Sequence, residues 1–121
     1  MATTVFPTTA PAVRPARASA PASAEITERF KYTFRPNFSQ PSEQRAQEAP
    51  GHMAGKAREV AAATGTRLSD VAGGPGRLHV NRFSGAFTGP AADARNAVDL
   101  MQAYGDKLDA WVGEPERPLP T

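Results

Sequence analysis

The distribution of proline limits most strongly what this chain can fold into. The sequence holds 12 prolines among 121 residues, and those at positions 7, 11, 15 and 21 fall within the opening segment MATTVFPTTAPAVRPARASAPASA. A proline ring fixes φ and removes the amide donor, so this segment cannot form a continuous helix. Its apolar side chains Val5, Phe6 and Val13 are too few to form a core. We therefore expect residues 1–24 to be an extended Pro-rich N-terminal arm, either disordered or bound along a partner.

The arm also has the composition of a targeting or secretion leader. It is rich in hydroxyl residues, has no acidic residue and carries two cations, Arg14 and Arg17. Organelle transit peptides share this composition. One hypothesis is therefore a small secreted effector that a leader delivers to another compartment.

The remainder of the chain is long enough for one small domain with a thin core. We place this domain at residues 25–113 and a Pro-rich tail at residues 114–121. The sequence contains no cysteine, which excludes disulfides, thiolate zinc sites and cysteine nucleophiles. No stretch approaches the roughly 20 apolar residues that a membrane-spanning helix needs, so we expect no membrane insertion.

The segment EITERFKYTFR, residues 25–35, has the clearest strand pattern. Ile26, Phe30, Tyr32 and Phe34 alternate onto one face, and the opposite face carries the cations Arg29, Lys31 and Arg35. This period of two predicts a strand with one face on the core and one in solvent.

Two helices and a break are predicted next. Ser42 can cap a short helix over SEQRAQEA, residues 42–49, which Pro50 and Gly51 then end. The alanine-rich segment 52–64 is helical by propensity.

Gly65 separates two interpretations of the segment REVAAATGTRLSDVAGG, residues 58–74. In the favoured one, Gly65 is the left-handed cap of the preceding helix, and the following residues are extended with Leu68 facing inward. In the other, residues 58–72 form a helix-turn-helix. The second helix would then have under two turns before GGPG ends it, which is short for reading a major groove.

A turn and a bent strand follow. Residues 73–76, GGPG, predict a turn, and residues 77–87 predict extended structure. Because Leu78 and Val80 share one parity while Phe83 and Phe87 share the other, we expect a bulge or tight turn near Asn81 and Arg82.

The strongest helical stripe lies near the C-terminus. Ala97, Met101, Tyr104, Leu108 and Trp111 follow one another at spacings of a helical face. This stripe packs either against the sheet or, in the alternative, into the groove of a partner. Gly113 ends the helix.

Together these elements predict an α+β fold, a small single domain with a short antiparallel sheet and two helices on one face, preceded by the extended arm. His52 and His79 are the only imidazoles, and no catalytic motif accompanies them. We therefore predict a non-enzymatic protein and assign no catalytic, cofactor-binding or metal-binding residue.

The leading functional prediction is a non-catalytic protein–protein interaction or assembly subunit. It would bind a protein partner or larger assembly through the arm and through the sheet edge or the C-terminal helix. The candidate contacts are Phe6, Val13, Arg14, Arg17, Met101, Tyr104, Leu108 and Trp111. The alternative is a basic RNA- or DNA-binding module that uses Arg29, Lys31, Arg35, Arg67, Arg77 and Arg82 together with the two arginines of the arm.

Overall fold

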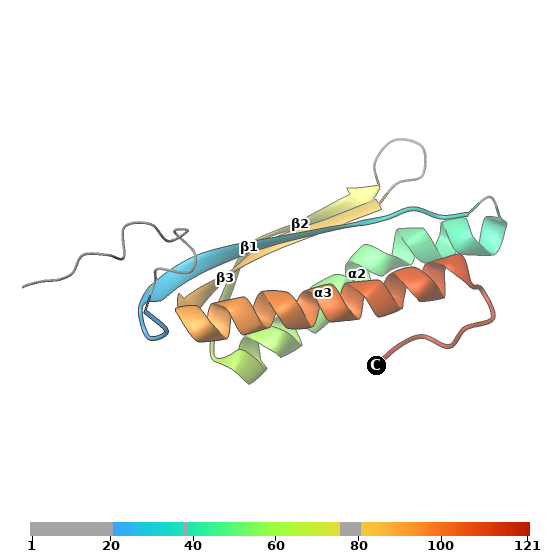
Figure 1. Cartoon of the computed structure of the whole chain (residues 1–121). Helices are drawn as coiled ribbons and strands as arrows, with labels where there is room; N and C mark the ends of the chain where they lie inside the picture. The colour runs from blue at the N-terminus through green and yellow to red at the C-terminus, as the bar shows by residue number, and fades with distance from the viewer. Residues whose placement is uncertain (1–20, 38, 76–80) are drawn as a thin grey trace, which may run out of the picture.

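A three-stranded antiparallel sheet with two helices on one face forms the domain (Figure 1). The computed structural model describes residues 21–37, 39–75 and 81–121. The elements are β1 (Glu25–Phe34), α2 (Gln40–Thr64), β2 (Arg67–Pro75), β3 (Asn81–Pro90) and α3 (Ala91–Gly113). The strand order is β1-β3-β2, so β1 and β2 are the edges of the sheet. The predicted α+β fold is confirmed, whereas the predicted arm falls largely on residues 1–20, outside the described residues.

The sheet register places four phenylalanines toward the helices. β1 pairs with β3 without interruption from Glu25 opposite Pro90 to Phe34 opposite Asn81. A register shift interrupts the pairing of β2 with β3 between Ser69 and Ala72. Alternation along these strands buries Phe30, Phe34, Phe83 and Phe87 in the core.

Helix α2 is continuous, so the predicted break at Pro50 and Gly51 is wrong. Pro50 lies inside the helix and is buried, in line with Ala46, Ala49 and Met53. An internal proline costs a helix about 3 kcal/mol, and the packing of this buried stripe offsets that cost.

The helix also begins earlier than predicted. Ser39 is its N-cap, and the Ser39 hydroxyl accepts from the amide of Ser42. Ser42 is buried, and its hydroxyl accepts from the amide of Asn37 at 2.9 Å. Ser42 therefore fixes the loop before the helix.

Gly65 ends α2 as the favoured interpretation predicted. Its φ of 71° and ψ of 27° are left-handed, and its amide donates to the Ala61 carbonyl. Residues 67–75 form β2, with Leu68 packed against the core. A second helix is therefore absent from residues 66–72, and the helix-turn-helix interpretation is wrong.

The predicted turn at residues 73–76 is wrong for residues 73–75, and Gly76 lies outside the described residues. Gly73, Gly74 and Pro75 belong to β2, and β3 is regular from Asn81 onward. The irregularity lies instead in β2, where Asp70 has a φ of 54°. Leu78 and Val80, on which the expected register change depended, lie outside the described residues.

The apolar stripe of α3 packs inside the domain. Met101 and Leu108 have no exposed surface, and Tyr104 and Trp111 are also buried. In the folded domain these four side chains, which were predicted to contact a partner, belong to the core.

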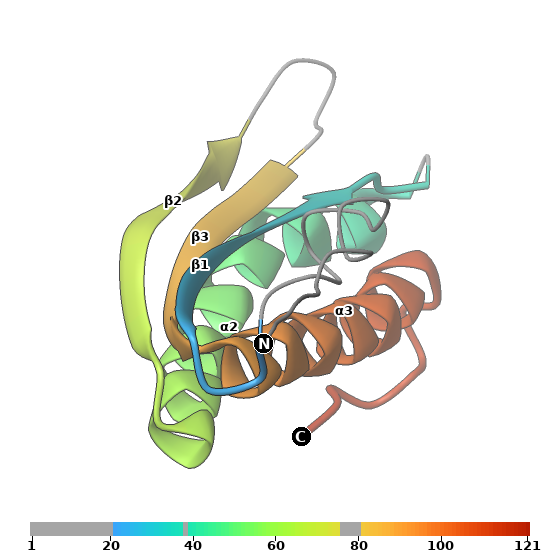
Figure 2. The ribbon, with the colours of Figure 1, turned by 60° about the vertical axis from the view of Figure 1, so that its left-hand side comes forward.

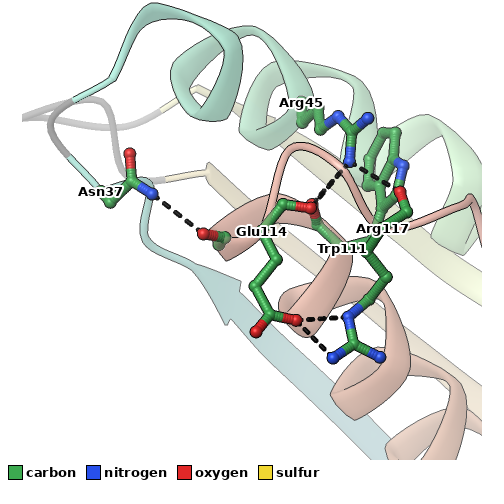
Figure 3. Close-up of polar contacts among 6 residues, drawn as sticks. Asn37, Arg45, Trp111, Glu114 and Arg117 are labelled. Carbon is green, nitrogen blue, oxygen red and sulfur yellow. Dashed lines mark hydrogen bonds and ion pairs between the residues drawn. The ribbon is translucent and has the colours of Figure 1, made fainter.

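The C-terminal end of α3 is held by a side chain from α2 (Figure 3). The Nη1 atom of Arg45 donates to the carbonyls of Trp111 at 2.8 Å, Arg117 at 3.1 Å and Glu114 at 3.3 Å. The same guanidinium lies 4.5 Å from the centre of the Trp111 ring. Arg45 thus satisfies carbonyls that the end of a helix leaves without an internal partner.

Candidate functional site

The face of the sheet opposite the helices is open. Both helices lie on one side, and among the described residues no helix or strand covers the other (Figure 2). Strand register determines which side chains this open face carries. It carries Glu25, Thr27, Arg29, Lys31 and Thr33 from β1, Arg82, Ser84, Ala86 and Thr88 from β3, and Arg67, Ser69, Ala72 and Gly74 from β2.

Four of the six cations predicted to bind nucleic acid outside the arm come together on this face. They are Arg29 and Lys31 from β1, Arg67 from β2 and Arg82 from β3. Arg35 follows the end of β1 and lies near Asp109 of α3, where its charge opposes the increase in the pKa of that carboxyl caused by burial. Arg77 lies outside the described residues, as do Phe6, Val13, Arg14 and Arg17 of the predicted partner-binding set.

Two of these cations are paired with acids across the sheet. Nη1 of Arg29 lies 3.2 Å from Oδ2 of Asp70, and Nη1 of Arg67 lies 2.9 Å from Oε2 of Glu25. Hydrogen bonding and charge attraction to Arg67 lower the pKa of Glu25. All four side chains are well exposed, and exposed ion pairs contribute only about 0–1 kcal/mol, so a ligand can displace them at low cost.

The other two cations, Lys31 and Arg82, have no acidic partner in the described part of the chain. Lys31 is opposite Ser84, and Arg82 is opposite Thr33, so the two cations are diagonal neighbours on adjacent strands. A shallow hollow of about 290 Å³ lies beside them, lined by Lys31, Ala72, Gly73, Gly74, Arg82 and Ser84. It exists because β2 presents only small residues here.

No aromatic side chain of the described strands lies on the open face. Their rings belong to Phe30, Tyr32, Phe34, Phe83 and Phe87, all on the helix side by the register. Surfaces that bind single-stranded nucleic acid combine cations with exposed rings on which bases stack. The open face supplies the cations but none of the rings.

The two edges of the sheet differ as templates for another strand. β1 has ten residues in regular pairing and no proline, whereas β2 carries the register shift and the left-handed Asp70. Bulges blunt an edge strand against further pairing. β1 is therefore the edge better suited to accept a strand.

The remaining reactive residues are dispersed or structural. The His52 ring meets the Trp111 ring edge-on at 5.5 Å, and His79 lies outside the described residues. Across residues 21–37, 39–75 and 81–121, no three His, Cys, Asp or Glu side chains are grouped to hold a metal ion. Within the same ranges, no helix has the length and apolar character to span a membrane.

The sequence analysis did not identify Asp70 and Glu25 as partners of these arginines, and it did not single out the hydroxyl of Ser84 on this face. Asp70 and Glu25 reach their arginines only through the cross-strand register, for which the sequence carries no direct signal. The outward direction of Ser84 follows from its alternation with Phe83 and was predictable.

No protein-family model, no curated protein and no solved structure matches the chain.

Proposed function

We propose that this protein is a non-catalytic interaction subunit that binds an extended acidic segment of another protein along the outer edge of β1. The observation that carries the proposal is a regular ten-residue edge strand bearing two exposed cations, Arg29 and Lys31, on a face that no described helix or strand covers.

The geometry supports addition of a strand. A peptide that pairs with the outer edge of β1, where no described strand lies, gains main-chain hydrogen bonds, and its side chains alternate between the two faces of the sheet. Arg29 and Lys31 are two residues apart, so they face successive open-face positions of the added strand. Acidic side chains at those positions form cross-strand pairs worth about 0.2–1 kcal/mol each.

Nucleic acid is the competing ligand. The open face gathers four of the predicted cations, which favours a phosphate backbone, but the described strands place no aromatic ring on this face for bases to stack on. Protein is therefore the partner that we favour.

The test uses three fluorescent probes at two salt concentrations. They are a ten-residue peptide of alternating Thr and Glu, the same peptide with Lys in place of Glu, and a 20-nucleotide oligo-dT. We expect only the Glu peptide to bind, and we expect it to slow hydrogen exchange of β1 amides. Arg29→Glu should weaken binding several-fold, whereas Arg58→Glu, an exposed change of equal charge on α2, should not.

Two results would overturn the proposal. One is failure of the Glu peptide to bind. The other is oligo-dT binding that falls steeply with salt and leaves β1 amide exchange unchanged, which would establish phosphate-driven nucleic-acid binding instead.

A further inference from the structure

We propose that the hollow beside Lys31 and Arg82 binds a phosphoryl dianion. This site lies across β1, β3 and β2 on the open face, inside the edge of β1, and it does not depend on strand addition at that edge.

The charge of the hollow matches such a ligand. Two like charges lie on diagonally neighbouring positions of adjacent strands, and no ion pair joins either of them to an acid within the described ranges. Arg29 and Arg67, by contrast, each have a carboxylate partner on the same face. A bound dianion relieves the repulsion between Lys31 and Arg82 and forms charge-assisted hydrogen bonds with both.

The shape of the hollow also matches a single compact group. Ser84 is opposite Lys31 and two residues along β3 from Arg82, and it supplies a hydroxyl donor. Ala72 and Gly74, opposite Ser84 and Arg82, leave the space above β2 unfilled. Even a Cβ on Gly74 would meet nothing within 4 Å. At about 290 Å³ the hollow has room for one phosphoryl group.

The proposal is tested by titrating ¹⁵N-labelled full-length protein with inorganic phosphate, and separately with free phosphoserine. Chloride at equal ionic strength is the control. We expect saturable shifts of the Ser84 and Gly74 amides with both phosphoryl compounds and not with chloride. Binding of phosphate alone would assign the hollow to the free anion, and tighter binding of phosphoserine would assign it to a phosphorylated side chain.

Three variants separate this site from general charge attraction. Arg82→Gln and Lys31→Gln should each weaken phosphate binding about tenfold, because each removes hydrogen bonds to a charged group. Ala72→Leu should block the hollow without changing the charge, and its amide spectrum shows whether the fold is kept. Arg58→Gln, on the exposed surface of α2, should change nothing.

The proposal is wrong if phosphate shifts do not saturate, if chloride reproduces them, or if Arg82→Gln binds phosphate as the parent does. Arg82 is not on the edge strand, whereas Arg29 is not in the hollow. Loss of peptide binding in Arg29→Glu and loss of phosphate binding in Arg82→Gln therefore report on the two proposals separately.

Discussion

A Cβ atom placed on Gly105 would lie 2.6 Å from both Cδ2 and Cε2 of Tyr32, so the Tyr32 ring rests directly on the backbone of α3. Gly105 is buried in the middle of that helix, where glycine is otherwise unfavourable. Because Gly105 has no side chain, β1 can approach α3 this closely.

We predict that Gly105→Ala destabilises the protein by about 1–3 kcal/mol, because the added methyl group displaces the ring and overpacks the contact. Chemical denaturation measures the change in free energy of unfolding.

Gly55→Ala in α2 is the matched control. A Cβ there meets nothing within 4 Å, so the variant should gain about 0.5–1 kcal/mol from the lower chain entropy of alanine. Equal effects of the two substitutions would refute the steric explanation.

Tyr32 also donates its hydroxyl to Oδ1 of Asp106 at 2.7 Å. Burial raises the pKa of Tyr32 far above its usual value of 10, and the hydrogen bond and charge of Asp106 raise it further. The fold thus favours the neutral phenol. Its contribution to stability is complete below the unfolded pKa of about 10 and is lost as pH rises toward the folded pKa.

We predict that Tyr32→Phe lowers stability at neutral pH by about 0.5–1.5 kcal/mol through loss of this hydrogen bond. Above pH 10 the difference in free energy of unfolding between Tyr32→Phe and the parent should narrow. The reason is that ionisation of the phenol stabilises the unfolded parent, while the folded parent keeps its phenol neutral. Denaturation at pH 7, 9, 10 and 11 measures this, and a constant difference across that series would contradict the assignment. The pKa of Tyr104, also raised by burial, adds the same dependence to both proteins.

The elements with a strong local pattern were predictable from the sequence. The alternation in β1 and the stripe of α3 each set a buried face, and one packing arrangement satisfies both. Gly65 was predictable for a different reason, since a left-handed cap favours glycine wherever a helix ends.

The features that sequence reasoning missed depend on tertiary context. Proline and glycine usually end a helix. At positions 50 and 51, however, the packing of α2 against the core outweighs this local preference. The register shift at Asp70 was not predicted, because it depends on the pairing of β2 with β3. The bulge or turn predicted near Asn81 depended on Leu78 and Val80, which lie outside the described residues. The sequence predicted only part of the open face, because the cross-strand register decides which of its cations have an acidic partner.

Arg45 supplies the third prediction. No basic residue lies in the last turn of α3, so Arg45 of α2 provides the donors for its terminal carbonyls. Arg45→Met keeps an apolar stem against Trp111 but removes these bonds, and we expect a loss of about 1.5–3 kcal/mol. Arg45→Lys keeps the charge and should lose less.

Thermal unfolding followed by Trp111 fluorescence measures both variants, because Trp111 is the only tryptophan and contacts the guanidinium. Arg58→Met is the control, since Arg58 is exposed on the same helix and its replacement should alter stability by no more than about 0.5 kcal/mol. An equal loss in the control would assign the effect to net charge.

Gly65 gives the last prediction, through the conformation that joins α2 to β2. A residue with a side chain loses about 1–2 kcal/mol in the left-handed region, while asparagine tolerates it better. No atom lies within 4 Å of a Cβ at this position, so the cost arises from the backbone alone. Gly65→Ala should therefore destabilise by about 1 kcal/mol and Gly65→Asn by less, as measured by urea denaturation. If alanine proved as stable as glycine, the left-handed conformation would not limit the choice of residue here, and the assignment of Gly65 as the left-handed cap of α2 would be contradicted.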